Sequence, residues 1–173
     1  MSNDLHPPLL SLSPWLAAAL LGLGATALFD VWLWVLKTQL GVPTASFGLI
    51  GRWVGHMASG RFVHAAIARA QPLRHELALG WLLHYAVGLA FGAGLLAWQG
   101  LAWLQQPSLG PALGFSLATV LLPLGLMQPA WGGGLFARKT ATPLQSCLRS
   151  LLNHLVFGLG LYLTALALRQ LSG

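Results

Sequence analysis

Hydrophobic positions run through this chain in four long stretches, which shorter and more polar connections separate. A helix needs about 20 apolar residues to cross the roughly 30 Å hydrocarbon layer of a membrane. The pattern therefore predicts an all-α integral membrane protein whose four transmembrane helices form a compact bundle, over about 15–36, 77–104, 111–127 and 150–168. Pro123 lies inside the third stretch, where its missing backbone N–H favours a kink.

The connection over 38–75 is the longest and the least regular of the three. Basic and imidazole side chains recur along it and make spanning costly: Arg52, His56, Arg61, His64 and Arg69. We expect one or two short helices in this segment, lying at the membrane interface or tucked under the bundle.

Small and polar residues recur at every fourth position within three of the apolar stretches. In the second stretch the row reads Glu76, Gly80, His84, Gly88 and Gly92, which a helix brings close to one face. The first and fourth stretches carry similar rows: Gly22, Thr26, Asp30, Trp34 and Ser150, His154, Gly158, Tyr162. Such rows let a second helix approach closely inside a membrane, so their histidines and Asp30 are expected to face protein rather than lipid.

Composition supports a membrane protein. Hydrophobic residues make up 56% of the 173 residues and charged residues only 7%, whereas soluble domains carry about a quarter charged residues. The length suits a single transmembrane domain over 1–173. The single cysteine excludes an intramolecular disulfide and, within one chain, a thiolate metal cluster.

The net charge of +6 comes from basic residues whose distribution along the chain predicts how the protein is oriented in the membrane. It does not indicate a nucleic-acid partner. Basic residues gather in the first and third connections, and none lies in the second connection or before the first stretch. Positive charge stays cytoplasmic, so 38–75 is expected to be a cytoplasmic interfacial segment and both termini to be periplasmic. Contact with the bilayer and with anionic lipid head groups explains the same charges.

Three ionisable side chains are expected to lie at one depth. At 1.5 Å per residue, Asp30 lies roughly 10 Å inside the cytoplasmic boundary, His84 roughly 12 Å and His154 roughly 8 Å. A charged group at such a depth costs about 2.5 kcal/mol or more, so it should have a partner. Pairing Asp30 with one or both histidines is the simplest arrangement.

The leading hypothesis is that this cluster binds a transition-metal cation or handles protons, for transport or for ion binding. Two imidazoles and a carboxylate suit zinc, iron or copper, and His56 or His64 could complete the coordination sphere from the cytoplasmic side. Alternatively the same groups relay protons, because imidazole titrates near neutral pH.

Three alternatives remain open at the level of sequence. His84 and His154 could ligate a b-type haem as its two axial ligands. A membrane-embedded, metal-dependent enzyme could act on a lipid or prenyl-type substrate, with Arg52, Arg61 and Lys139 binding an anionic head group. Finally, the polar residues could only hold helices together in a non-catalytic accessory subunit. Four short spans leave little room for a channel within one copy, which favours a homodimer or a subunit of a membrane complex.

Several motifs together resemble a family of small bacterial inner-membrane proteins known as domain of unknown function 2938: GRWVGH (51–56), GRFVH (60–64), GWLLHYAVG (80–88), QPAWGGG (128–134) and SLLNHLVFGLGLY (150–162). The resemblance covers nearly everything from the first span to the last. It implies a four-span protein of a bacterial inner membrane and carries over no catalytic residue.

Overall fold

The computed structural model describes residues 13–44 and 46–171, in which the regular secondary structure is helical. Four segments are long and apolar enough to span a membrane, and they are the four that the sequence predicts. Their bounds are Pro14–Thr38 (α1), Glu76–Gln99 (α3), Leu109–Ala130 (α4, η4 and α5 together) and Pro143–Leu171 (α6).

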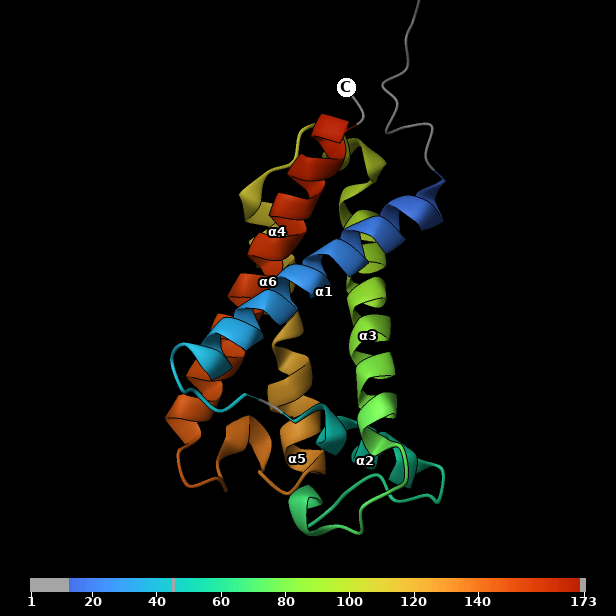
Figure 1. Cartoon of the computed structure of the whole chain (residues 1–173). Helices are drawn as coiled ribbons and strands as arrows, with labels where there is room; N and C mark the ends of the chain where they lie inside the picture. The colour runs from blue at the N-terminus through green and yellow to red at the C-terminus, as the bar shows by residue number, and fades with distance from the viewer. Residues whose placement is uncertain (1–12, 45, 172–173) are drawn as a thin grey trace, which may run out of the picture.

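The spans form a bundle in which α1 runs obliquely across α3 and α6 (Figure 1). Since the spans are even in number, the start of α1 and the end of α6 lie at the same end of the bundle, whereas α2 and α5 lie at the other end. We call these the terminal end and the loop end. Large apolar side chains project outward from the spans, as lipid contact requires: Leu23, Val31, Leu82, Leu89 and Leu163 among them.

Glycines bring α1 and α3 into close contact, as the four-residue rows predict. Gly88 and Gly92 of α3 and Gly22 of α1 are buried at the crossing. A Cβ added to Gly92 would lie 2.6 Å from the carbonyl oxygen of Ala18 and 2.7 Å from the amide nitrogen of Gly22. The two backbones therefore touch with no side chain between them, which is the packing expected of small residues in membranes.

The first connection contains two short helices, α2 (Phe47–Met57) and η2 (Ile67–Arg69), as the sequence predicts. α2 packs against the start of α3. Gly51 and Gly80 lie at this crossing, and a Cβ on either one would overlap the backbone of the other helix. The segment is thus fastened to the bundle at the loop end.

The second span ends five residues earlier than the predicted boundary at 104, because α3 stops at Gln99. Gly100 has φ +77° and ψ 163°, a backbone conformation that is almost restricted to glycine. The 3₁₀ helix η3 (Leu101–Gln105) then turns the chain away from the α3 axis and buries Trp103 and Leu104.

The third span is interrupted near its middle. α4 (Leu109–Thr119) leads into a π-helical turn, η4 (Leu122–Met127), and then into the single turn α5 (Gln128–Ala130). Pro123 lies at the start of this π-helical turn, so the expected kink takes the form of a π-bulge.

The fourth span, α6, begins at Pro143, before the expected start at 150, and continues to Leu171. The short 3₁₀ helix η5 (Leu135–Ala137) lies between α5 and α6.

Two clusters of buried apolar side chains hold these elements together. The larger one joins α1, α3, η3, α4 and α6 and is built from small and branched residues such as Ala17, Leu21, Leu95 and Leu161. The smaller one lies at the loop end and joins Trp53, Ile67 and Ala130. The indole N–H of Trp53 donates to the carbonyl of Phe62 at 2.8 Å. The loop end therefore has a small packed core of its own.

Candidate functional site

A carboxylate and two ring side chains meet between α1 and α3, on the loop side of the glycine crossing. Nε2 of His84 lies 2.8 Å from Oδ1 of Asp30, and the hydroxyl of Tyr85 donates to Oδ2 of Asp30 at 2.8 Å. The side chain of His84 is 12% exposed and that of Asp30 is 21% exposed. We call Asp30, His84 and Tyr85 the polar triad. The predicted pairing of Asp30 with an intramembrane histidine is found here.

The triad fixes the tautomer of His84. An ionised carboxylate is only an acceptor, so Nε2 of His84 must carry the hydrogen that lies between the ring and Asp30. In the neutral ring Nδ1 is then the free basic nitrogen.

Aromatic rings surround His84. The ring centroid of Phe47 lies 4.5 Å from that of His84, Tyr85 lies at 5.4 Å, Trp81 at 5.7 Å and Phe29 at 6.0 Å. These rings come from α1, α2 and α3, so the imidazole is packed between three elements of the chain.

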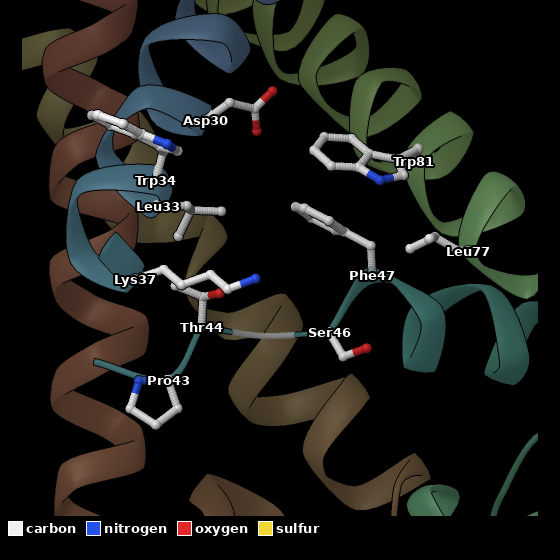
Figure 2. Close-up of a pocket in the computed structure, with 10 residues that line it drawn as sticks. All are labelled: Asp30, Leu33, Trp34, Lys37, Pro43, Thr44, Ser46, Phe47, Leu77 and Trp81. Atoms are coloured by element: carbon white, nitrogen blue, oxygen red, sulfur yellow. The ribbon is translucent and has the colours of Figure 1, made fainter. Parts of the chain in front are cut away.

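A pocket of about 560 Å³ lies between α1, the connection that follows it, the start of α2 and α3, and Asp30 is the member of the triad that lines it (Figure 2). Asp30 and Lys37 are the charged residues of its lining. In the close-up the side chains of Asp30, Lys37, Phe47 and Trp81 project into the space from opposite sides. Asp30 thus lines an open space on its loop side, and the close contact of α1 and α3 at Gly22 and Gly88 lies on its other side.

His154 does not join the triad. Its Nδ1–H donates to the carbonyl of Ser150 at 2.8 Å, one turn back on α6. Its own carbonyl accepts from the hydroxyl of Ser116 at 2.7 Å, which ties α4 to α6. The expectation of one cluster containing Asp30, His84 and His154 is therefore not met, because equal depth places residues on a level but does not turn them toward one another.

His56 and His64 form a second pair of rings at the loop end, with centroids 5.2 Å apart. His56 is 2% exposed, and its Nε2 donates to the carbonyl of Gln71 at 2.9 Å. Both ring nitrogens of His64 are buried, with no hydrogen-bond partner among the described residues. Across the described residues, no three His, Cys, Asp or Glu side chains are grouped so that they could hold a metal ion.

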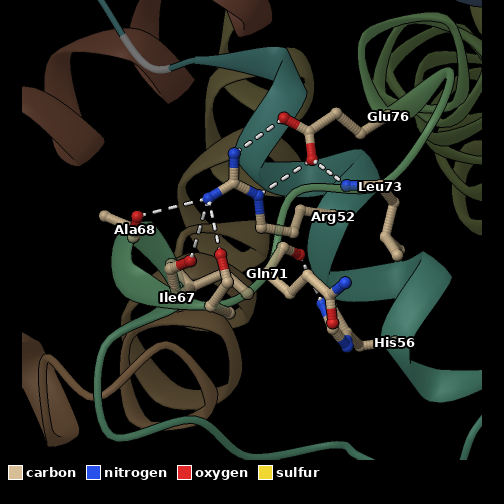
Figure 3. Close-up of polar contacts among 8 residues, drawn as sticks. Arg52, His56, Ile67, Ala68, Gln71, Leu73 and Glu76 are labelled. Carbon is tan, nitrogen blue, oxygen red and sulfur yellow. Dashed lines mark hydrogen bonds and ion pairs between the residues drawn. The ribbon is translucent and has the colours of Figure 1, made fainter.

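Arg52, expected to bind an anionic head group, has protein partners instead (Figure 3). Its guanidinium binds both carboxylate oxygens of Glu76, with Nε to Oε2 at 2.8 Å and Nη2 to Oε1 at 2.7 Å. Nη1 donates to the carbonyls of Ala68 at 3.2 Å and Ala70 at 3.1 Å. This pair pins the loop after α2 to the start of α3. The other two basic candidates, Arg61 and Lys139, are exposed at the loop end.

Two partners in these contacts, Tyr85 and Glu76, do not follow from the four-residue spacing. Tyr85 follows His84 directly, and neighbouring residues on a helix do not share a face, yet the two oxygens of Asp30 diverge enough to reach both. A signal was present, because a tyrosine inside an apolar span needs a hydrogen-bond partner. Glu76 belongs to the four-residue row of α3, but it is also one of only three acids in the chain, which makes it a candidate partner for Arg52.

His64 gives the folded chain an expected dependence on pH. Burial of the ring, together with the positive charges of His56 and Arg61, lowers the pKa of His64 below its ordinary value of 6.5. The unfolded ring regains the ordinary value, so in mild acid the unfolded state binds more protons than the folded state. The contribution of His64 to stability is thus fully present above about pH 6.5 and is lost as the pH falls through that value toward the lowered pKa.

Thermal unfolding of the detergent-solubilised protein at neutral and at mildly acidic pH measures this effect. The midpoint is expected to be lower in acid, and His64→Gln, which removes the titrating ring, is expected to reduce the difference. The control is His75→Asn, because His75 is exposed and asparagine tolerates its φ of +64°. An acid shift of the same size in wild type and His64→Gln would contradict the assignment.

The fold and the paired ionisable side chains inside it define an integral membrane protein of the helical-bundle class. The chain belongs to the family described as "Protein of unknown function (DUF2938)", whose model matches residues 19–168. This confirms the resemblance carried by the motifs. No curated protein and no solved structure matches the chain.

Proposed function

We propose that this protein handles protons inside the membrane at His84, as a step of proton-linked transport. The observation that carries the proposal is the hydrogen-bonded triad of Asp30, His84 and Tyr85, in which Asp30 also lines a pocket. Ionisable groups are costly at this depth, and in transport proteins they mark proton pathways. The bonds within the triad hold the ring in one orientation through both of its protonation states.

Each member of the triad has a separate role in the proposed step. His84 takes up and releases the proton at Nδ1, the nitrogen that its bond to Asp30 leaves free. Asp30 keeps the tautomer and neutralises the protonated ring. Tyr85 donates to the second oxygen of Asp30 and so holds the carboxylate in place at 2.8 Å.

The proposed step is one of alternating access, in which the proton enters from the loop side. The pocket extends from Asp30 to Pro43 and Thr44 at the loop end, and the α1–α3 crossing at Gly22 and Gly88 lies on the other side of Asp30. Release to the terminal side then requires α1 and α3 to separate at this crossing. The buried cluster that joins α1 and α3, with Leu21 and Leu95, has to rearrange in this step.

Metal binding has less support from the arrangement of side chains. The described residues hold no group of three metal ligands, and His154 lies apart from the triad. Haem ligation through Nε2 of His84 requires loss of its bond to Asp30, since one nitrogen cannot serve both. The alternative of a metal-dependent enzyme has less support for the same reason, because it also needs a group of metal ligands. Proton handling needs only groups that are already in contact.

We further propose that the protein lies in a bacterial inner membrane with its loop end in the cytoplasm. The support is the distribution of charge: Lys37, Arg52 and Arg61 lie in or beside the first connection, and the stretch over 100–108 at the terminal end has no Lys or Arg. Anionic head groups of the inner leaflet then face the basic loops.

Proton flux into reconstituted vesicles tests the proposed function. Vesicles with a trapped pH-sensitive dye receive an acid step, with valinomycin and potassium present to dissipate the membrane potential. Wild type is expected to acidify the interior faster than protein-free vesicles do. His84→Gln, which keeps a side-chain amide in reach of Asp30 but cannot be protonated, is expected to reduce the flux to the protein-free level.

His154→Gln is the matched control, because it also removes an intramembrane histidine but leaves the triad intact. Its flux is expected to equal that of wild type. ¹⁵N spectra of histidine-labelled protein in nanodiscs give an independent readout, in which the His84 ring, assigned by its loss in His84→Gln, should titrate with pH. Wild-type flux at the protein-free level, together with a His84 ring that does not titrate, would refute proton handling.

A further inference from the structure

A second pocket lies at the loop end, away from the polar triad. It has a volume of about 470 Å³ and is bounded on one side by residues 63–65 and on the other by Pro129, Gly132, Gly134 and Lys139. The two sides are far apart in sequence, since one follows α2 and the other follows α5. Nothing in the proposed proton step uses this pocket, so it requires its own explanation.

Backbone hydrogen bonds make its two walls one unit. The amide of His64 donates to the carbonyl of Ala130 at 2.8 Å, and the amide of Ile67 donates to the carbonyl of Trp131 at 3.1 Å. Lys139 is held at the rim by its amide, which donates to the carbonyl of Gly133 at 2.8 Å. The pocket is thus preformed by the fold and does not depend on a loose loop.

Glycine is required where the walls meet. Gly132 has φ +93°, and a Cβ there would lie 2.8 Å from the carbonyl oxygen of His64 and closer still to that of Ala65. Any side chain would push the segment over 63–65 away from the turn. The run Gly132–Gly134 is therefore a close-packed turn.

His64 supplies an unused polar group in the wall. Its Nδ1 and Nε2 are both buried, and neither has a hydrogen-bond partner among the described residues. A neutral imidazole has one donor and one acceptor, and leaving both unmade in a buried place costs free energy. Such orphaned groups call for a ligand or an ordered water.

The charge around the pocket has one sign. Lys139 lines it, and the positive charges of Arg61 and His56 act on His64. Of the chain's three acids, Asp30 is bonded to His84 and Glu76 to Arg52, both away from this pocket, and Asp4 lies outside the described residues. The described residues thus place cations here and no carboxylate, which suits an anion and opposes a metal cation.

We infer that this pocket binds a phosphate group through Lys139 and His64. Lysine binds phosphate as a point charge, and the imidazole N–H of His64 gives a directed hydrogen bond to a phosphate oxygen. The site lies among the basic loops of the bundle, where a lipid phosphate and a soluble phosphate are both within reach. Arg52, whose guanidinium is bonded to Glu76, takes no part.

Two binding experiments separate the sources of phosphate. In the first, inorganic phosphate is titrated into purified protein in an uncharged detergent, with sodium chloride of equal ionic strength as the blank. In the second, the thermal midpoint is compared in phosphatidylcholine nanodiscs with and without phosphatidic acid. Saturable binding in the first arm assigns a soluble ligand, and stabilisation in the second arm alone assigns a lipid head group. No response in either arm overturns the inference.

Lys139→Gln is expected to weaken the response about tenfold or more, as the loss of one charge-assisted hydrogen bond predicts. Lys139 is exposed, so this change should not disturb folding. Arg138→Gln is the matched control, because Arg138 is the adjacent exposed cation and does not line the pocket. An equal loss in both variants would show a general charge effect and overturn the site. The ¹⁵N ring signals of His64 should move on binding in wild type and in Arg138→Gln but not in Lys139→Gln.

Discussion

Gly92→Ala is expected to destabilise the bundle by about 1–3 kcal/mol, the usual cost of an added methyl group in a packed interior. The new Cβ would lie 2.6 Å from the carbonyl oxygen of Ala18 and 2.7 Å from the amide nitrogen of Gly22. These are backbone atoms of α1, so no side chain can rotate away, and the two helices must separate. Thermal unfolding in detergent, followed by circular dichroism, measures the loss.

Gly114→Ala is the matched control for this prediction. Gly114 lies in α4 and is exposed, and a Cβ there meets nothing within 4 Å. It is expected to be neutral, or to stabilise by up to about 1 kcal/mol through helix propensity. Separation of α1 from α3 also stretches the bond between Asp30 and His84, so Gly92→Ala should lower proton flux as well. Equal stability of the two alanine variants would show that the crossing is looser than the structure has it.

Arg52→Ala is expected to release the segment between α2 and α3. The substitution removes both bonds to Glu76 and the bonds to the carbonyls of Ala68 and Ala70. The Glu76 carboxylate then keeps only its bond from the amide of Leu73. Hydrogen exchange should therefore speed up over residues 67–73, and a protease added to the detergent-solubilised protein should cut there sooner than in wild type.

Two further variants show whether this effect is specific. Arg52→Lys keeps the charge but cannot form the two-pronged contact with Glu76, so its exchange should be intermediate. Arg69→Ala removes an exposed arginine of the same segment and should leave exchange as in wild type. If Arg52→Ala and Arg69→Ala behave alike, the pair with Glu76 is not what holds the segment.

The spans were predictable because apolar length is a strong local signal. Each of the four expected segments is a helix, with boundaries that shift where a local feature decides them. α3 ends at Gly100 because of its φ, and α6 starts early at Pro143, where proline suits a first helical turn. The glycine rows were also informative, since the spacing of Gly88 and Gly92 alone placed them at a helix crossing.

The candidate site was predictable only in part. Depth along a helix follows from residue number, and it placed Asp30 beside His84 correctly. Rotation about the helix axis does not follow in the same way, because it depends on which neighbour each face meets. His154 therefore bonds to its own helix and not to Asp30. Tyr85 donates to the second carboxylate oxygen of Asp30. Helical spacing does not predict this contact, because it depends on the direction in which that oxygen points.

The sequence by itself determined that this is a four-span helical membrane protein with paired polar groups buried in it, because the cost of placing such groups in lipid leaves few other solutions. Only the tertiary structure decided which groups pair. It joined Asp30 to His84 and Tyr85, joined Arg52 to Glu76, and set His64 beside Lys139 in a pocket. These pairings depend on how the helices cross and rotate, which is fixed by contacts between segments far apart in the chain.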